Sequence, residues 1–573
     1  MLNIRDLKEH PPEKDHIAYF TMEVGISHMI PTYSGGLGIL AGDILKSYAD
    51  INLPVIGITL LNSKGYFYQK FDENHNQIED PVNWNIEESM ELLPNKVVVN
   101  IEGRDVYVKA WKHMIRGQLG HNIPVIFLDT DCEENSEWDK NITSHLYGGD
   151  RWYRLCQEIV LGVGGVRMLE SLNYNKIKKY HMNEGHAALL TVELLNKSSV
   201  NENIDIIPVK DKCVFTTHTP VAAGHDKFDV DLFLKATGNL VPIEIMEKIV
   251  QDGKVNMTLL ALIMSTYVNG VAKRHGEVSR EMFPEYQIDS ITNGVHLPSW
   301  ISMQMKSVFD KHIPGWSIDP YTLRSALSIP KEDIDHAHHE AKNILIDYIN
   351  QEKNIGFHPD RFTIGFARRF TAYKRPDLIL HDIERLKKVA EKVGDIQVVF
   401  AGKAHPSDTV GKQIINKIIN TCNQINDENG KLKMVFLENY NMLLSRKMVS
   451  GSDVWLNTPQ RPYEASGTSG MKAALNGVPQ ISTIDGWWVE GLVENVTGWG
   501  LGKAPQDPGF NEDFDPTEEA EDLYYKLENV IVPMYYANKD KWLDIRRHAI
   551  AMNASFFNTY RMAQQYVANA YLD

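Results

Sequence analysis

The second half of the chain alternates five short apolar segments with longer stretches whose apolar residues recur at helical spacing. The apolar segments are residues 362–367, 396–401, 434–437, 454–456 and 480–483. Such alternation predicts a parallel sheet, because each helix returns the chain to the edge where the previous strand began. The first half follows the pattern less regularly, with strands expected at 17–20, 123–128 and 213–216. We therefore predict the α/β class, with two doubly wound, Rossmann-like domains that face a shared cleft.

An irregular stretch that contains several prolines, residues 298–338, separates the two halves. At 573 residues the chain is long enough for two sizeable cores. We expect an N-terminal domain of residues 1–297 and a C-terminal domain of residues 298–545. The remaining residues, 546–573, continue a helical pattern that begins near residue 541, and we expect this single long helix to pack across both domains.

An excess of acidic residues sets the general chemistry of the surface. The 75 aspartates and glutamates outnumber 59 lysines and arginines, which gives a net charge of −16. This charge argues against nucleic acid or an anionic membrane as a partner, and no apolar run reaches the length of a membrane span. Four widely spaced cysteines fit neither a zinc site nor a disulfide framework, and the first ten residues lack an apolar signal core. We therefore expect a cytoplasmic protein without a bound metal.

Residues 463–477 read Tyr-Glu-Ala-Ser-Gly-Thr-Ser-Gly-Met-Lys-Ala-Ala-Leu-Asn-Gly and lie between two of the expected strands. A helix is expected from Ser469 to Gly477, and the free N–H groups at its start attract an anion. Lys472 lies about one turn inside that helix. A phosphate cradle beside a lysine is typical of a pyridoxal phosphate site, although an isolated Gly-Thr-Ser-Gly would sooner mark an ordinary capped helix. The spacing excludes a Walker A loop. The candidate cradle consists of Ser466, Gly467, Thr468 and Ser469.

Four cations follow the first strand of the second half, where residues 368–375 read Arg-Arg-Phe-Thr-Ala-Tyr-Lys-Arg. The carboxyl end of a parallel strand is where such sheets bind ligands. Arginine and lysine at this position could hold phosphate oxygens by charge-assisted hydrogen bonds. The alternative is a solvated surface run, and we favour phosphate binding because of the placement in an otherwise acidic chain.

Two loops of the first half also follow expected strands. Residues 33–43 read Tyr-Ser-Gly-Gly-Leu-Gly-Ile-Leu-Ala-Gly-Asp, and their glycines can form a backbone nest for a polar or anionic ligand. They do not match a dinucleotide fingerprint, because Gly36-x-Gly38 lacks the third glycine. His186 follows a glycine at an expected helix start, where ligands are commonly bound, although most lone histidines serve only in packing.

The run 463–477, together with Asp485-Gly486 and Val489-Glu490, resembles the coenzyme segment of the α-glucan (glycogen, maltodextrin) phosphorylases. The loop 33–43 and the downstream run 64–67, Lys-Gly-Tyr-Phe, resemble the same family, and the similarity extends from about residue 19 to about residue 490. The resemblance implies a GT-B enzyme that carries pyridoxal 5′-phosphate on Lys472. It further implies reversible transfer of the terminal glucosyl unit of an α-1,4-glucan (glycogen, starch or maltodextrin) to inorganic phosphate. The product would be α-glucose 1-phosphate, with the configuration retained.

The resemblance also assigns roles to single residues. Arg369 and Lys374 match the pair that binds the substrate phosphate, and with the sugar-contacting His186 they are the expected catalytic residues. Arg368 matches the contact to the coenzyme phosphate, and Glu464 would accept hydrogen bonds from a glucose hydroxyl. The other expected coenzyme-site residues are Lys472, Gly467, Thr468, Ser469, Gly36, Tyr440 and Trp300. The other expected substrate-binding residues are Asn293, Ser466, Gly35 and Leu37.

Departures from the animal enzymes point to the compact bacterial and archaeal branch of the family. Ser469-Gly470 replaces Gly-Asn, Thr371-Ala372 replaces His-Glu, and Trp487-Trp488 replaces Ala-Asn. Few residues precede the glycine loop, so we expect an enzyme without allosteric control by AMP or phosphorylation.

Two other functions stay open. A nucleotide-sugar-dependent glucan synthase shares the fold and an Arg/Lys pair, but it has no use for a coenzyme lysine. A non-catalytic glucan-binding protein should have lost charged site residues, and none is missing here. A glycoside hydrolase would need two carboxylates across one bond, and nothing in the sequence pairs Glu464, Asp485 or Glu490 in that way. Glucan length, the physiological direction and the formation of a homodimer are left open.

Overall fold

The computed structural model describes residues 8–198, 204–427, 430–507, 510 and 515–572. The chain divides into two compact units. The first comprises Met1–Phe67, Pro81–Thr292 and Thr559–Asp573, and the second comprises Tyr68–Asp80 and Asn293–Asn558. Residues 1–7, which make up most of the segment inspected for a signal core, lie outside the described residues. Within the described part of the chain, no helix is both long and apolar enough to cross a membrane.

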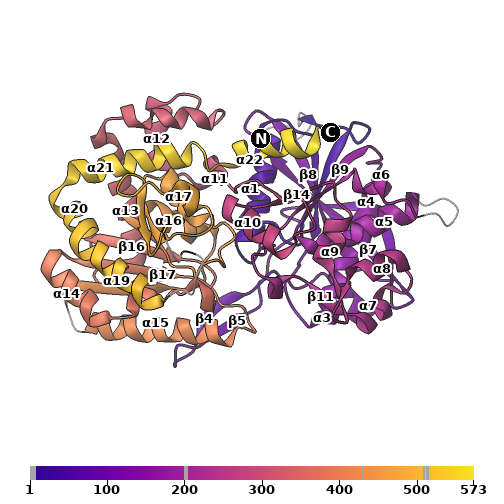
Figure 1. The fold of residues 1–573 in the computed structure, drawn as a ribbon, viewed down its shortest axis with the longest axis horizontal. Helices are drawn as coiled ribbons and strands as arrows, with labels where there is room; N and C mark the ends of the chain where they lie inside the picture. The colour runs from indigo at the N-terminus through magenta and orange to yellow at the C-terminus, as the bar shows by residue number, and fades with distance from the viewer. Residues whose placement is uncertain (1–7, 199–203, 428–429, 508–509, 511–514, 573) are drawn as a thin grey trace. The chain divides into compact units, whose positions relative to one another are not determined.

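The large sheet of the second unit is wholly parallel, with the order β18-β17-β16-β19-β20-β21 among the described residues (Figure 1). Numbered along the chain, these strands follow the order 3-2-1-4-5-6 of a doubly wound sheet, which confirms the expected class. The order reverses between β16 and β19, so the loops after these two strands meet at the switch point. The strands are β16 (Phe362–Ala367), β17 (Ile396–Ala401), β18 (Leu432–Leu437), β19 (Val454–Asn457), β20 (Gln480–Thr483) and β21 (Gly498–Leu501).

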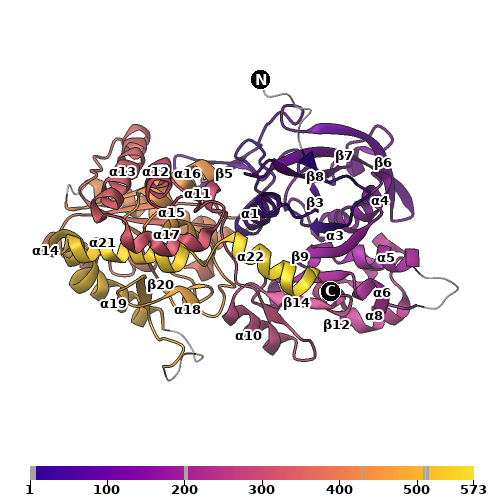
Figure 2. The ribbon, with the colours of Figure 1, turned by 90° about the horizontal axis from the view of Figure 1, so that it is seen from above.

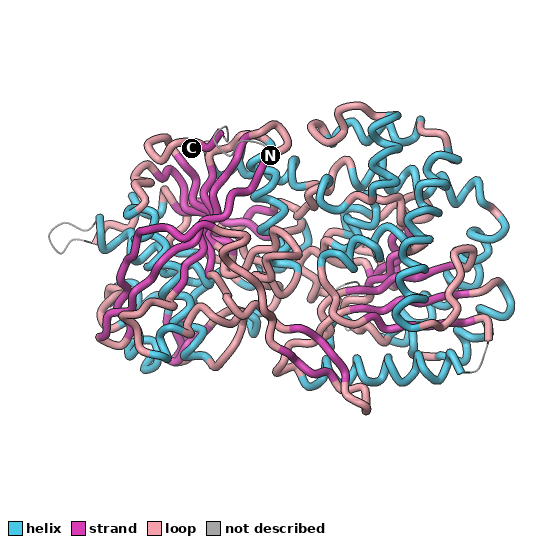
Figure 3. The backbone as a smooth tube through the Cα atoms, turned by 180° about the vertical axis from the view of Figure 1, so that it is seen from behind, coloured by secondary structure: helices cyan, strands magenta, loops and turns pink. Residues whose placement is uncertain are grey.

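Helices cover both faces of this sheet (Figure 3). Val398 and Phe400 belong to the core beneath α14 and α15, whereas Val399 and Ala401 belong to the core beneath α13 and α16. Because neighbouring strand residues point to opposite faces, burial on both sides produces the largely apolar runs seen in the sequence. The helices of this unit are α11 (Leu297–Trp300), α12 (Met303–His312), α13 (Lys331–Lys353), α14 (Ile383–Val393), α15 (Thr409–Asp427), α16 (Met442–Gly451), α17 (Ser469–Leu475), α18 (Trp488–Gly491), α19 (Pro516–Lys526), α20 (Val532–Ala537) and α21 (Lys539–His548).

The large sheet of the first unit has a parallel part with the order β8-β3-β2-β9-β10-β14-β15. Numbered along the chain, these strands again follow the order 3-2-1-4-5-6, with a seventh strand added, and the order reverses between β2 and β9. The antiparallel strands β7 and β6 extend the sheet beyond β8, and β1 also pairs with β8. The strands are β1 (Lys8–Glu9), β2 (His16–Phe20), β3 (Val55–Leu60), β6 (Glu91–Ile101), β7 (Arg104–Arg116), β8 (His121–Asp129), β9 (Ile177–Asn183), β10 (Cys213–Thr216), β14 (Tyr267–Gly270) and β15 (Asp289–Ser290).

The helices of the first unit include one from the far end of the chain. Helix α22 packs beside α1 (Figure 2), and the hydroxyl oxygens of Ser47 and Thr559 lie 2.6 Å apart. A small sheet of β11 (Lys227–Asp229), β12 (Val250–Gln251) and β13 (Lys254–Asn256) completes the unit. The helices are α1 (Gly36–Asp50), α2 (Glu137–Lys140), α3 (Arg151–Ile159), α4 (Gly165–Ser171), α5 (Leu189–Ser198), α6 (Ile207–Lys210), α7 (Val230–Thr237), α8 (Ile243–Ile249), α9 (Met257–Ile263), α10 (Lys273–Met282) and α22 (Thr559–Tyr566).

A hairpin early in the chain belongs to the second unit. Its strands β4 (Tyr68–Phe71) and β5 (Gln77–Asp80) form a separate antiparallel ribbon, seen as a pair of strands apart from the large sheets in Figure 3. The chain leaves the first unit at Phe67 and re-enters it at Pro81. No pattern in the sequence predicts this excursion.

The expectation of one continuous helix over residues 541–571 is wrong. Helix α21 passes into a π-helix over Ala549–Ala554, and the next α-helix, α22, begins only at Thr559. Asn558 pairs with Val295 as an isolated bridge, and Gly294 lies so close that an added Cβ would be 2.3 Å from the Asn558 carbonyl carbon. The backbone of Asn558 is thus used for a contact outside the helix, which interrupts the helical ladder.

Candidate active site

The loops after β16 and β19 bring three charged side chains of the second unit together. Arg368 and Lys374 follow β16, and Glu464 lies in the loop after β19. Both cations bind the same oxygen, Oε2 of Glu464, and the Lys374 Nζ lies 2.5 Å from it. The three side chains are only 9–11% exposed. The switch point of the sheet therefore holds two cations and one anion in a largely buried position.

The charge state of Glu464 follows from these partners. Burial raises the pKa of this carboxyl, but Arg368 and Lys374 outweigh burial and hold the pKa at about 2. The backbone N–H of Glu464 donates to Asp485 Oδ2 over 2.9 Å, which fixes the loop. Glu464 is ionised at neutral pH, so it can accept hydrogen bonds from hydroxyl groups. It does not fit the proton-donating acid of a glycoside hydrolase, which needs a raised pKa.

The four cations of residues 368–375 have different environments. Arg368 donates from Nη1 to Asn457 Oδ1 over 3.1 Å, and its buried Nε has no partner among the described residues. Arg369 is exposed and makes no hydrogen bond or ion pair within the described chain. Arg375 is buried, donates to two backbone carbonyls after β19 and pairs with Glu519 over 2.5 Å. Arg375 is thus a structural residue, while Arg368 and Lys374 form the candidate anion site.

Helix α17 begins at Ser469 and is followed by Gly477 at φ +68°, as the sequence predicts. Thr468 is its N-cap residue, but no side chain caps the helix. The Ser469 hydroxyl accepts a hydrogen bond from Trp455 Nε1 over 3.0 Å, and the Ser466 hydroxyl donates to the Gly467 carbonyl over 3.1 Å. The first N–H groups of α17 therefore lack a side-chain cap, a state that favours an anionic group at this end.

Lys472 points into a buried aromatic surface. Its Nζ lies 3.6 Å from the centroid of the Trp300 ring, and the residue is 6% exposed. Asn476 links helix α17 to helix α11, because its side-chain amide donates to the carbonyl of Lys472 over 2.9 Å and to the carbonyl of Trp300 over 3.0 Å. The lysine is therefore held against α11 in one orientation.

Two further residues expected at the site have defined places in the second unit. Tyr440 follows β18 and donates its hydroxyl to Ser445 Oγ over 2.9 Å. Asn293 is 5% exposed and precedes Gly294, which packs against the backbone of Asn558. Both residues lie on loops that stable elements hold in place.

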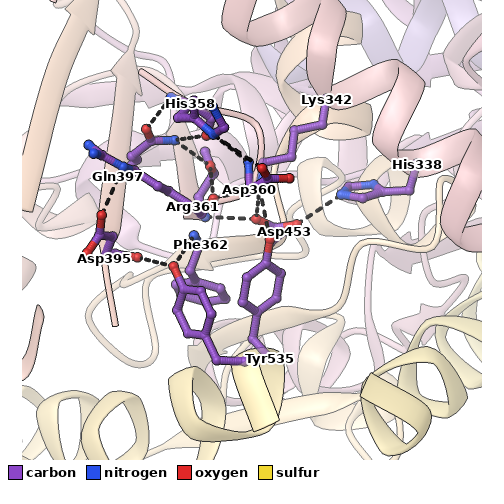
Figure 4. Close-up of polar contacts among 12 residues, drawn as sticks. His338, Lys342, His358, Asp360, Arg361, Phe362, Asp395, Gln397, Asp453 and Tyr535 are labelled. Carbon is purple, nitrogen blue, oxygen red and sulfur yellow. Dashed lines mark hydrogen bonds and ion pairs between the residues drawn. The ribbon is translucent and has the colours of Figure 1, made fainter. Parts of the chain in front are cut away.

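A buried ionic cluster supports helix α17, which carries Lys472, at its carboxyl end. Asp453, immediately before β19, accepts hydrogen bonds from Lys342 Nζ (2.5 Å), His338 Nε2 (3.0 Å) and Arg546 Nη2 (3.1 Å), and Figure 4 shows the first two beside it. Arg546 also donates from Nη1 to the carbonyl of Gly477 over 3.0 Å. The cluster therefore links α13 and α21 to the start of β19 and to the carboxyl end of α17. No pattern in the sequence predicts this cluster.

The switch point of the first unit holds His186. The backbone N–H of Met22, after β2, donates to His186 Nε2 over 3.1 Å. Burial lowers the pKa of His186 to about 3, so the ring is neutral and carries its proton on Nδ1. Glu184 has φ +87°, and its carboxylate accepts hydrogen bonds from the backbone N–H groups of Gly185 (2.9 Å) and His218 (2.7 Å). Such a strained, tightly bonded residue is common at functional sites, and no sequence pattern marks Glu184 as one.

The glycine loop of the first unit is anchored by Glu23. This carboxylate accepts hydrogen bonds from the Ser34 backbone N–H (2.6 Å) and the Tyr147 hydroxyl (2.9 Å). A Cβ added at Gly35 or Gly36 would meet no atom within 4 Å, so these two glycines are not required by packing. The neighbouring Leu37 is partly exposed. The loop therefore presents backbone groups on a rigid base at the start of α1.

Buried neutral histidines make the first unit sensitive to acid. Burial lowers the pKa of His181 to about 3, while its ordinary value is 6.5. The unfolded chain therefore takes up this proton first, and stability falls as pH decreases from 6.5 towards 3. We expect His181→Gln to reduce this pH dependence by about 1.4 kcal/mol per pH unit between pH 6 and pH 4. Thermal unfolding at several pH values, with the exposed His28→Gln as a control, measures the effect. Identical pH profiles for wild type and His181→Gln would contradict it.

Comparison with known proteins places the chain in a family. The carbohydrate phosphorylase family profile matches residues 234–499. The chain is 37% identical to maltodextrin phosphorylase of Thermococcus litoralis, over 98% of this chain and 71% of the relative. It is 34% identical to glycogen phosphorylase of Aquifex aeolicus, over 99% and 87%, and 33% identical to glycogen phosphorylase of Mycobacterium tuberculosis, over 97% and 70%.

Two doubly wound sheets with polar side chains at their switch points define an α/β protein that binds its ligands at those points. The extended similarity narrows the class further. The chain belongs to the carbohydrate phosphorylase family.

Proposed function

We propose that this protein catalyses the reversible phosphorolysis of α-1,4-glucans and releases α-glucose 1-phosphate with retention. The observation that carries the proposal is the convergence of Arg368 and Lys374 on one buried carboxylate at a switch point. Two cations in a largely buried position suit a small dianion such as inorganic phosphate better than a neutral nucleophile such as water. Family membership, and relatives named for maltodextrin and glycogen, support the choice of glucan.

In this reaction one bond to C1 of the terminal glucose breaks and another forms. The bond to O4 of the next glucose breaks, and a bond to a phosphate oxygen forms on the same face. The proton of hydrogen phosphate passes to O4 of the shortened glucan, so the reaction consumes no other acid. Arg369 and Lys374 are proposed to hold the substrate phosphate, and Arg368, which shares Glu464 with Lys374, is proposed to contact the coenzyme phosphate. Glu464, His186 and Asn293 are proposed to bind glucose hydroxyls, and the His186 carbonyl to face the positive charge that develops on the sugar.

The residues around α17 fit pyridoxal 5′-phosphate. The uncapped start of α17 and the hydroxyl of Thr468 suit a phosphate group, and the unpartnered, buried Nε of Arg368 offers a further donor in the described chain. Lys472 offers an amine for covalent attachment, and the Trp300 ring beneath it offers an apolar wall. When bound, the coenzyme supplies a phosphate group that can donate and accept a proton beside the substrate phosphate. Gly36, Gly467, Ser469 and Tyr440 stay predicted members of the coenzyme site, and Gly35, Leu37 and Ser466 of the substrate site.

Borohydride reduction tests this assignment. We expect the purified protein to absorb as a pyridoxal protein, and reduction to fix the coenzyme on the peptide that contains Lys472. Lys472→Ala should take up no label, while Lys374→Ala, which keeps the other lysine, should be labelled as wild type. An active protein without coenzyme, or a label on another lysine, would refute the assignment. The same experiment separates the proposal from a nucleotide-sugar-dependent glucan synthase, which needs no such lysine.

The proposal extends to the wider organisation of the protein. We keep the division into domains of residues 1–297 and 298–545, and the linking role of residues 546–573, as predictions. A cytoplasmic location is supported by Cys132, Cys156, Cys213 and Cys422, all of which are buried free thiols. The expected partners are α-1,4-glucan, inorganic phosphate and glucose 1-phosphate, and a homodimer is left open.

A further inference from the structure

We propose that Gln69 and Gln77, on the hairpin β4–β5, are positioning residues for the phosphate-binding segment Arg368–Lys374. The inference rests on the proposed function, because it concerns how the second unit holds its phosphate-binding cations. Within the described chain, Gln69 and Gln77 make no hydrogen bond to the side chains of Arg368, Arg369 or Lys374, so any effect they have on phosphate binding acts through the backbone.

The two glutamines form a closed set of hydrogen bonds beneath the loop after β17. Gln69 is fully buried and Gln77 is 6% exposed. Gln69 Nε2 donates to Gln77 Oε1 and to the Gly402 carbonyl, each over 2.9 Å. Gln77 exchanges a pair of hydrogen bonds with Ala404, accepting from its N–H and donating to its carbonyl, each over 3.0 Å.

The remaining groups of the two amides are also bonded. Gln69 Oε1 accepts from the N–H of Asn439 over 2.9 Å, and Gln77 Nε2 donates to Glu79 Oε1 over 2.6 Å. Every amide hydrogen and oxygen of the glutamine pair therefore has a partner. A buried polar network that is fully satisfied specifies one geometry, whereas a partly satisfied one is costly. The pair is built to hold residues 402–404 in a fixed position.

Residues 402–404 in turn carry the cation segment. The N–H of Phe370 donates to the Lys403 carbonyl over 2.9 Å, and Phe370 pairs with Ala404 as a parallel bridge. Gly402 has φ +152°, and an added Cβ would lie 2.0 Å from the carbonyl oxygen of Arg368. The loop after β17 is therefore in direct backbone contact with Arg368 and Phe370, the residues before and after Arg369. A shift of residues 402–404 must move Arg368, whose side chain binds Glu464.

The tip of the same hairpin offers a matched control. His75 binds Asn420 of α15 over 2.7 Å, and the Asn74 carbonyl accepts from Asn416 over 2.6 Å. These bonds anchor the hairpin to the second unit without touching residues 402–404. His75→Ala therefore loosens the hairpin while leaving the glutamine pair in place.

The decisive experiment compares Gln77→Met with His75→Ala. Gln77→Met keeps the length of the side chain but leaves both backbone groups of Ala404 unpaired. We expect its KM for inorganic phosphate to rise about tenfold, because small displacements of positioning groups are costly, while its KM for maltodextrin stays within about twofold. Hydrogen exchange of the peptide covering residues 366–376 should accelerate in this variant. His75→Ala should match wild type in both measurements.

Two results would overturn the inference. One is a Gln77→Met protein with wild-type phosphate KM and wild-type exchange, and the other is a His75→Ala protein that changes both as much. If Gln77→Met does not fold, Gln77→Asn, which keeps the amide on a shorter side chain, is judged by the same criteria. Wild-type protein that forms no glucose 1-phosphate would refute the proposed function instead, and hydrogen exchange alone would then decide whether the glutamines position residues 368–374.

Discussion

Replacing Lys374 by alanine is expected to lower kcat/KM for inorganic phosphate about ten- to a hundredfold. Inorganic phosphate is small and doubly charged, so its binding depends on charge-assisted contacts, each worth roughly 1.5–3 kcal/mol. The Lys374 side chain is 9% exposed and its Nζ lies 2.5 Å from Glu464, so solvent screens its charge little. The loss should affect kcat as well as KM, because the phosphate must give up a proton and face a developing sugar cation in the transition state.

Three further variants make this result specific. Lys374→Arg keeps the charge and should recover part of the lost activity. Arg368→Lys and Arg369→Lys replace a bidentate fork by a point charge, and both should be costly if both arginines contact phosphates. If Lys374→Ala kept wild-type phosphate kinetics but lost bound coenzyme, the division of roles among these cations would be wrong. Steady-state kinetics and coenzyme content, measured on the same samples, decide the question.

Asp453→Asn is expected to destabilise the second unit by about 3–5 kcal/mol. The carboxylate is 1% exposed and accepts hydrogen bonds from Lys342, His338 and Arg546. A neutral amide would leave two buried cations without a counter-charge and would place an N–H₂ group against their donors. Because Arg546 also binds the carbonyl of Gly477, the change should loosen α17 and weaken coenzyme retention before the unit unfolds.

Asp360→Asn serves as the matched control for this prediction. Asp360 lies near Asp453 in Figure 4, but its ion pair with His358 is exposed, at 58% and 76% for the two side chains. Exposed pairs contribute little, so this variant should unfold within about 0.5 kcal/mol of wild type. Thermal and denaturant unfolding of both variants measures the difference. Equal effects for the buried and the exposed aspartate would contradict the role given to the cluster.

The strands of the second unit could be predicted from the sequence because they are buried on both faces. Residues 362–367 and 396–401 are accordingly apolar apart from Thr363 and Gln397, and the structure places strands at the same positions. The hairpin β4–β5 was missed because its strands are short and only partly buried, so they show no comparable pattern. The break at residues 555–558 was missed because it depends on Gly294 and Val295, far away in the chain.

The candidate site was predictable where its residues are adjacent in the sequence. The run 463–477 contains the helix start, the hydroxyls and Lys472 together, so its chemistry could be inferred directly. The different environments of Arg368 and Arg369 could not be inferred, because they depend on how the backbone turns after β16. The partners of Asp453 come from two helices that lie far apart in the sequence, α13 and α21, and only the fold brings them to one carboxylate.

The most direct test of the account follows the fate of inorganic phosphate. Purified protein is incubated with a linear α-1,4-glucan and phosphate, and the reaction is monitored by phosphorus and proton NMR. We predict that phosphate disappears and α-glucose 1-phosphate appears in equal amounts while the glucan shortens, and that adding the product in excess lengthens the glucan again. Release of free glucose or maltose without consumption of phosphate, formation of the β anomer, or glucan growth only from a nucleotide sugar would contradict the account.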